Sequence, residues 1–263
     1  MILYHQTLAD KCNKILEVGV GTGRSSQMFT QSFMKQGAVY INTDISEKMI
    51  EIFKKNLSVT GYDAEYQDTY TEILPEDDKK KIAILKANNE ELPFPDEEFD
   101  CYISNLSLHI VNNHHNQLLE AYRVLKPESK AGFTVWGNRS RCRCFTFLEE
   151  SLKKHDYDYS LDPSIAKSFE ISDPVQLRKD TLAAGFKIYK TFVVNLPFAS
   201  KNPEDFLNFM VKGSFDMYAK EKDFDDATKE DLWNKVSVDF DTQFGPDSPE
   251  IPDFEQIVII ATK

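Results

Sequence analysis

Short apolar runs and amphipathic segments alternate along the first half of the chain. The apolar runs predict five strands, at 14–18, 38–43, 81–86, 99–104 and 131–136. Amphipathic segments predict helices between them, near 24–36, 46–58 and 113–125. Strands that alternate with helices of this length are typical of βαβ units around a parallel sheet. The pattern therefore predicts an α/β fold.

The second half of the chain continues this pattern with interruptions. Three further elements are predicted, a helix at 173–185 and strands at 186–198 and 255–262. An irregular region at 138–171 and a Phe-rich helical region at 199–250 separate them. At 263 residues the chain suits one domain with insertions better than two domains. We therefore expect a single domain over 1–263, with a core at 12–137 and cap insertions at about 138–171 and 199–250.

The net charge of the chain limits the kinds of binding partner that we expect. A net charge of −12 argues against a nucleic-acid partner, because phosphate backbones bind clustered Lys and Arg. Region 199–250 holds 13 Asp and Glu against 6 Lys, so it contributes −7 of that charge and is a possible surface for a protein partner.

The sequence predicts neither a membrane-spanning helix nor a signal peptide. No apolar run approaches the roughly 20 residues of a membrane helix, and the first residues lack the basic start and apolar stretch of a signal peptide. We expect no membrane span and a cytoplasmic protein, with the mitochondrion as the alternative compartment.

The four cysteines give no metal signature. Cys142 and Cys144 form a Cys-Arg-Cys pair without a second pair, and Cys12 and Cys101 stand alone. We expect reduced, mostly buried thiols and no bound metal.

Residues 14–23, KILEVGVGTG, combine a predicted strand with a glycine-rich turn. Glu17 ends the apolar run, and Gly19, Gly21 and Gly23 follow on alternate positions. Glycine permits sharp turns and a close approach by a ligand, so the segment predicts a nucleotide-type pocket at the end of the strand. Arg24 stands where a dinucleotide fingerprint has its third glycine, which disfavours a diphosphate ligand and a nicotinamide oxidoreductase. A ligand-free strand–helix turn is the alternative.

Asp44 lies at the end of the second predicted strand, 21 residues after Gly23. An acid at this place accepts hydrogen bonds from the two ribose hydroxyls of a nucleoside. The alternative is a helix cap, because Asp44 and Ser46 both precede the next helix.

Asparagines follow the next two predicted strands. Asn88 and Asn89 are placed to form hydrogen bonds with the edge of an adenine, and Asn105 is placed to face a ligand. Three apolar residues nearby would surround the ring, Leu92, Phe94 and Phe99. The alternative is that these asparagines only form turns in an ordered loop.

These motifs occur in a characteristic order: EVGVGTG, TDIS, ELPFPDEEFD, SNLSLH, and then EAYRVLKP with AGFTVWG. In this order the chain resembles the class I S-adenosylmethionine-dependent methyltransferases, and among them the type 11 group, which includes quinone-biosynthesis C-methyltransferases. The likeness is strong over about 12–137 and weak over 173–198 and 255–262. It implies a Rossmann-like, seven-stranded, mostly parallel sheet with an antiparallel last strand, helices on both faces and helical insertions.

The resemblance also implies where the cofactor would lie. Glu17 and the glycines Gly19, Gly21 and Gly23 would border the methionine part, and Asn105 would lie beside the sulfonium.

For the nucleoside, the resemblance implies that Asp44 holds the ribose hydroxyls and that Ile45 lies against the adenine. Asn88 stands where the family usually has an Asp that accepts from the adenine amino group, and its amide oxygen still accepts. Asn89 would offer its backbone N–H to the ring.

The implied activity is transfer of a methyl group to a small organic acceptor, with S-adenosylhomocysteine as the product. The alternative is a non-catalytic subunit with a methyltransferase fold, acting as a binding or structural component of a larger complex. His109, after the fourth predicted strand, is the best-placed catalytic base, although a packed or capping histidine is the favoured interpretation.

The acceptor site is less defined. Six residues are candidates for its lining, Trp136, Tyr157, Tyr159, Phe206, Phe209 and Met210, although such residues are more often core. Arg139, Arg141 and Arg143 would attract an acidic acceptor or form a solvated segment. Only about 13 residues precede the first strand, whereas relatives carry a longer helix that covers the cofactor. Either the pocket is more open, or 199–250 covers it.

Overall fold

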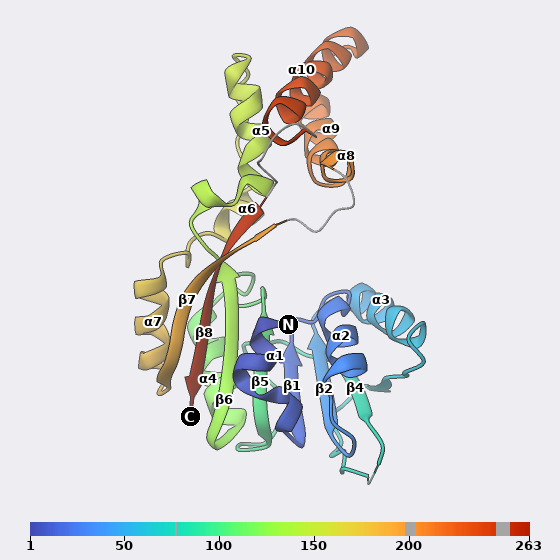
Figure 1. Ribbon diagram of the computed structural model, residues 1–263, viewed down its shortest axis with the longest axis vertical. Coiled ribbons are helices and arrows are strands. Elements are labelled where there is room, and N and C mark those ends of the chain that lie inside the picture. The colour runs from blue at the N-terminus through green and yellow to red at the C-terminus, as the bar shows by residue number, and fades with distance from the viewer. Residues whose placement is uncertain (77, 198–202, 246–252) are drawn as a thin grey trace. The chain divides into compact units, whose positions relative to one another are not determined.

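The computed structural model describes residues 1–263 except 77, 198–202 and 246–252 (Figure 1). The ends of the predicted 199–250 insertion, the last residue of the strand predicted at 186–198 and the side chains of Phe209 and Met210 therefore lie outside the described part. The chain divides into two compact units. The first is Met1–Val135 with Asp173–Phe192 and Ile257–Lys263, and the second is Trp136–Ser172 with Val193–Gln256.

Within the described residues, one sheet of eight strands runs in the order β3-β4-β2-β1-β5-β6-β8-β7. The strands are β1 Lys14–Val18, β2 Val39–Asp44, β3 Glu65–Gln67, β4 Lys81–Lys86, β5 Phe99–Asn105, β6 Leu125–Trp136, β7 Lys187–Pro197 and β8 Asp253–Thr262. Neighbours from β3 to β6 are parallel. Lys263 pairs with Ser129 while Glu255 pairs with Gly137, so β8 runs antiparallel to β6.

The predicted sheet is confirmed, except that it has eight strands and not seven. The additional strand is β3, whose three residues are mostly exposed and carry no apolar alternation that a sequence pattern could reveal. Strand β6 also begins six residues before the predicted start at 131, because Leu125 pairs with Phe99 of β5 and Glu128 and Ser129 bond to Lys263.

Helices cover both faces of the sheet in the first unit, as predicted. They are α1 Ile2–Thr7, α2 Arg24–Ser32, α3 Glu47–Ser58, α4 His114–Val124 and α7 Pro174–Ala183, with a 3-10 turn at Ala9–Lys11. Ile15 of β1 pairs with both Tyr40 and Cys101, so the side chain of Tyr102 points to the opposite face from that of Tyr40.

Aromatic and polar contacts identify the two faces. The Tyr40 ring meets Phe29 of α2 at 5.2 Å between centroids, whereas the Tyr102 hydroxyl accepts a 3.2 Å hydrogen bond from Gln117 of α4. With both faces covered, every residue of β1 and β2 is buried.

Side-chain caps fix the starts of the predicted helices. Ser46 accepts from the Met49 N–H at 3.4 Å and begins α3, Asn113 accepts from the His115 N–H at 3.0 Å and begins α4, and Asp173 caps α7. Helix α2 is shorter than predicted, because Phe33 leaves the helical conformation after Ser32.

The second unit has its own hydrophobic core. Its helices are α5 Arg143–Lys154, α6 Pro163–Lys167, α8 Pro203–Phe206, α9 Lys212–Glu221 and α10 Asp226–Phe244, with a 3-10 turn at Arg139–Arg141 and a π-helical turn at Leu207–Val211. Phe147 of α5 packs edge-on against Phe240 of α10, with ring centroids 5.4 Å apart. Buried phenylalanines of this kind account for the Phe-rich sequence of region 199–250.

Gly23 and Gly21 provide a matched pair for testing the turn after β1. Both adopt positive φ, +74° and +56°, which L side chains rarely adopt. A Cβ at Gly23 would lie 2.1 Å from the Phe53 ring, whereas a Cβ at Gly21 would meet no atom within 4 Å. Phe53 is fully buried in α3, in a close-packed core that resists displacement of its ring.

We expect Gly21→Ala to cost about 1–2 kcal/mol of unfolding free energy, from backbone strain alone. Gly23→Ala should cost about 1–3 kcal/mol more, because it also overpacks the core. Urea unfolding followed by circular dichroism measures both. Equal losses for the two variants would contradict the close packing of Phe53 on Gly23.

Candidate functional site

A cavity of about 530 Å³ lies at the carboxyl ends of four neighbouring parallel strands. Gly19 follows β1, Asp44 ends β2, Asn88 follows β4 and Ser107 follows β5. The lining residues are Gly19, Gly21, Asp44, Ile45, Ser46, Met49, Asn88, Asn89, Glu90, Ser107, Ile110, Val111 and Asn112. This edge is where doubly wound α/β sheets bind ligands, and the volume falls in the usual range of small-molecule sites.

A larger depression of about 700 Å³ lies at the amino ends of the strands. Lys14 at the start of β1 and Glu98 just before β5 border it, and these two side chains form an ion pair with each other. Half of its lining residues are charged. It lies at the amino edge of the sheet, whereas doubly wound sheets bind nucleotides at the carboxyl edge. The cavity at the carboxyl edge is therefore the candidate site.

Gly19 brings the ends of β1 and β5 together at the floor of the cavity. A Cβ at Gly19 would lie 2.5 Å from Ser107 Cβ and 3.3 Å from Asn89 Nδ2, so only glycine fits. The Ser107 hydroxyl donates to the Val18 carbonyl at 3.2 Å and pairs with the Ser104 hydroxyl at 2.8 Å. The sequence motif SNLSLH contains Ser107, but its contact with Gly19 depends on the pairing of β1 with β5.

Asp44 is held in place by backbone N–H groups on two sides. Its Oδ2 accepts from the Gly21 N–H at 2.8 Å, and its Oδ1 accepts from the Ser46 N–H at 2.9 Å. Ser46, and not Asp44, caps α3. A carboxylate oxygen has two acceptor sites, so each oxygen retains one beyond these bonds. Asp44 is therefore buried, fixed in orientation and still able to accept two hydrogen bonds from a ligand.

The rest of the cavity combines amides with exposed apolar side chains. Asn88 Oδ1 accepts from the Glu90 N–H at 3.1 Å, and Asn89 is buried beside it. Ile45 and Ile110 line the cavity although they are 64% and 67% exposed. Large apolar side chains that remain in water beside fixed polar groups offer a surface for a flat, partly apolar ligand. Sequence reasoning identified Ile45 but missed Ile110.

The structure thus brings together Gly19, Gly21, Asp44, Ile45, Asn88 and Asn89. Four other predicted residues are not among those that line the cavity, Glu17, Gly23, Asn105 and His109. Asn105 Oδ1 accepts from Thr134 Oγ1 at 2.9 Å. Phe94 and Phe99 also pack in the core, with ring centroids 5.0 Å apart, and not around the cavity. The cofactor contacts of all these residues stay predictions.

His109 is buried, and burial lowers its pKa to about 4. Its imidazole is therefore neutral near pH 7, in the form that can accept a proton, but it is a weak base. Its assignment as the catalytic base stays a prediction.

Glu17 is surrounded by hydroxyl groups. Its Oε2 accepts from Tyr4 of α1 at 2.7 Å, from Ser26 of α2 at 2.9 Å and from Tyr40 of β2. Its Oε1 accepts from Ser25 at 3.4 Å. Burial raises the pKa of Glu17 from 4.5 to about 7, and the hydroxyl donors offset part of that rise. Glu17 thus joins α1, α2 and β2 beneath the glycine turn.

The four candidates for the acceptor lining whose side chains are described belong to the core of the second unit. Phe206 is buried in it, and Tyr157 and Tyr159 pack against it. Trp136 packs edge-on against Phe145 at 5.1 Å. These contacts agree with the interpretation of these side chains as core.

The three arginines of the same unit pair with acids. Their partners are Glu149 for Arg139, Glu255 for Arg141 and Asp253 for Arg143. An acidic acceptor would have to compete with these carboxylates.

Two features are absent from the described part of the chain. Outside 77, 198–202 and 246–252, no group of three or more His, Cys, Asp or Glu side chains is arranged to hold a metal ion. Across the same residues, no helix combines the length and the apolar character needed to span a bilayer.

The fold, with its cavity at the carboxyl edge of the sheet, is that of the class I methyltransferases. Residues 16–133 match the family model described as a methyltransferase domain. The matched segment spans less than half of the chain, and over this segment the resemblance of the motifs to the type 11 group is confirmed.

A curated relative shares this domain. The ubiquinone/menaquinone biosynthesis C-methyltransferase UbiE of Haemophilus ducreyi is 32% identical over 120 residues, which cover 44% of this chain and 39% of that protein. The match thus spans less than half of either chain.

Solved structures share the fold over most of their length. A SAM-dependent methyltransferase from Methanosarcina mazei aligns with a TM-score of 0.53 at 16% identity, covering 100% of this chain and 97% of that one. The [4+2]-cyclase SpnF aligns with a TM-score of 0.53 at 17% identity, covering 100% and 79%. At these identities the likeness concerns the fold alone.

Glu17 gives the stability of the protein a pH dependence that can be measured. Its pKa in the native protein is about 7 and its ordinary value is 4.5, so the native protein binds more protons than the unfolded chain between these values. The stability that Glu17 contributes is complete below pH 4.5 and is lost as the pH rises to 7. Relative to Glu17→Gln, the wild type should lose about 2 kcal/mol between about pH 5.5 and pH 8.

Urea unfolding at both pH values measures this difference. Glu51→Gln, which changes an exposed carboxylate on α3, is the control and should follow the wild type. A Glu17→Gln variant with the same pH dependence as the wild type would contradict the burial of an ionisable group at this position.

Proposed function

We propose that this chain binds S-adenosylmethionine in the carboxyl-edge cavity and transfers its methyl group to a small organic acceptor. The observation that carries the proposal is Asp44, a buried carboxylate fixed by Gly21 and Ser46 with one acceptor site left on each oxygen. Two adjacent hydroxyl groups of a ribose match this pair of acceptors.

The other lining residues support the same ligand. The backbone at Gly19 and Gly21 lets a ligand approach without meeting a Cβ. Ile45 and Ile110 offer apolar surface to an adenine ring, and Asn88 and Asn89 offer amide groups to its edge. The residues present therefore fit the nucleoside part of the cofactor.

Catalysis of methyl transfer depends mainly on alignment. The cofactor supplies an electrophilic methyl group on a sulfonium, and the acceptor must lie in line with it. In this proposal the chain holds the ribose through Asp44 and the adenine through Ile45, Asn88 and Asn89, which fixes the rest of the cofactor relative to the sheet. His109 would accept a proton from the acceptor, if the acceptor loses one.

The acceptor is proposed only at the level of a small organic molecule. The Haemophilus ducreyi relative is named for ubiquinone and menaquinone biosynthesis, which makes a quinone precursor one candidate. The matched segment covers 39% of that protein, so the similarity supports the cofactor site more than the acceptor.

A non-catalytic subunit with the same fold is the second candidate. The fold is shared with the [4+2]-cyclase SpnF, which is named for a different reaction, so the fold alone does not determine the function. S-adenosylmethionine with a labelled methyl group separates the two candidates. Label that passes to extracted small molecules supports the enzyme, whereas tight binding without transfer supports the subunit.

Calorimetry with S-adenosylhomocysteine tests the cofactor site. The wild type should bind it, and Asp44→Ala should weaken binding by about 1–3 kcal/mol, because charge-assisted hydrogen bonds to the ribose are lost. The wild type should also prefer S-adenosylhomocysteine to its 2′,3′-dideoxy analogue, and Asp44→Ala should abolish that preference.

The preference separates a ribose contact from a loosened turn, because Asp44 also holds Gly21. A loosened turn would weaken both ligands and leave their ratio unchanged. Asp63→Ala, which removes an exposed carboxylate outside the cavity, is the matched control. Failure of the wild type to bind either S-adenosylmethionine or S-adenosylhomocysteine at millimolar concentration would sink the proposal.

A further inference from the structure

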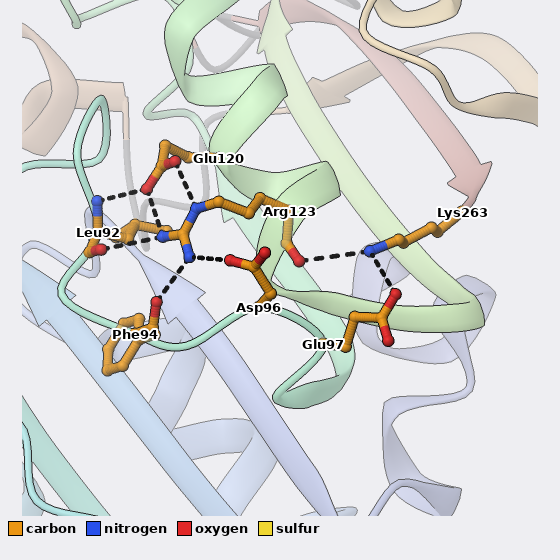
Figure 2. A network of polar contacts seen from close by, with 7 residues as sticks. All are labelled: Leu92, Phe94, Asp96, Glu97, Glu120, Arg123 and Lys263. Carbon is orange, nitrogen blue, oxygen red and sulfur yellow. Dashed lines mark hydrogen bonds and ion pairs between the residues drawn. The ribbon is translucent and has the colours of Figure 1, made fainter.

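Arg123, in the last turn of α4, uses its whole guanidinium group to hold the loop between β4 and β5 (Figure 2). Its Nε and Nη2 donate to the two carboxylate oxygens of Glu120, each at 2.8 Å. Its Nη2 also donates to the Leu92 carbonyl at 3.0 Å, and its Nη1 to the Phe94 carbonyl at 2.7 Å. Nη1 also donates to Asp96 Oδ1 at 2.7 Å. These bonds account for all five N–H donors of an arginine.

Glu120 acts together with Arg123, and we call these two side chains the clamp. Its Oε2 accepts from the Leu92 N–H at 2.7 Å, so both backbone groups of Leu92 are bound by the pair of α4 side chains. Burial alone would raise the pKa of Glu120, and the hydrogen bonds from Arg123 and Leu92 outweigh it and lower that pKa. The pair is therefore charged and shares its charge with the loop backbone.

The clamp itself is anchored at the end of the sheet. The Arg123 carbonyl accepts from the Glu97 N–H at 3.0 Å and from Lys263 Nζ at 3.3 Å. Lys263 in turn lies 3.4 Å from Glu97 Oε1 (Figure 2). Arg123 thus holds the loop from within a network that is fixed to β8.

The clamped loop begins with residues that line the cavity. Asn88 and Asn89 precede Leu92 by four and three positions. The Glu91 N–H donates to the Asn88 carbonyl at 3.0 Å, so the start of the loop is bonded to its middle. Asn89 Nδ2 lies 3.3 Å from the place of a Gly19 Cβ. A small shift of Leu92 would therefore move the two amides relative to the cavity floor.

We propose that Arg123 is a positioning residue that fixes Asn88 and Asn89 for recognition of the adenine base. This inference rests on the proposed function. Lysine would keep the charge, but as a single ammonium group it does not span Glu120 and both backbone carbonyls in one plane. Arg123→Lys should therefore disturb base recognition although the charge is preserved.

The first arm of the test needs no ligand. Hydrogen exchange of the 88–96 segment should speed up in Arg123→Lys, while exchange of α3, residues 47–58, stays as in the wild type. Arg178→Lys, at an exposed position on α7, is the matched control and should change neither segment. Unchanged exchange at 88–96 in Arg123→Lys would overturn the inference whatever the ligand.

The second arm measures recognition of the base. S-inosylhomocysteine carries a carbonyl oxygen where S-adenosylhomocysteine carries the adenine amino group, and this oxygen would face the Asn88 acceptor. The wild type should prefer S-adenosylhomocysteine by about tenfold, the worth of one hydrogen bond. Arg123→Lys should bring that preference close to one, and Arg178→Lys should retain it.

The outcomes separate the two proposals. If the wild type binds neither ligand, the proposed function fails. If it binds with the expected preference and Arg123→Lys keeps that preference, or weakens both ligands equally, the positioning role is wrong while the proposed function stands. Should Arg123→Lys fail to fold, Glu120→Gln, which keeps the length of its side chain, carries the same two measurements and the same expected results.

Discussion

The turn after β1 passes between two buried neighbours that leave no room for side chains. Gly19 lies against Ser107, which follows β5, and Gly23 lies against Phe53 of α3. Because the turn is fixed at both points, the Gly21 N–H is presented to Asp44 at the end of β2. Close backbone packing in the turn therefore decides the position of the acid that we assign to the ribose.

Two acidic residues near this edge of the sheet differ in their surroundings and in their roles. Glu17 lies in the core beneath the turn, where hydroxyl groups compensate for its burial. Asp44 lies at the cavity and binds backbone N–H groups that leave acceptor sites for a ligand. Arg123 then acts from outside the cavity, through the loop that carries Asn88 and Asn89. Stability and recognition thus depend on different polar residues, each held by its own set of hydrogen bonds.

Local patterns predicted most of the fold and half of the site. Strands β1, β2, β4 and β5 are buried apolar runs, and strong caps mark α3, α4 and α7, so their sequences are informative. The pocket residues that follow strand ends, such as Gly19, Asp44 and Asn88, were predictable for the same reason. Ser107 and Ile110 were not, because they enter the cavity only through the pairing of β1 with β5. The hydroxyl partners of Glu17 and the clamp of Arg123 likewise join residues far apart in the chain.

A crystal structure of the protein with S-adenosylhomocysteine tests the central claim most directly. We expect both ribose hydroxyls within hydrogen-bonding distance of the Asp44 carboxylate, with the adenine between Ile45 and the amides of Asn88 and Asn89. A ligand bound elsewhere, or a ribose that makes no contact with Asp44, would contradict it.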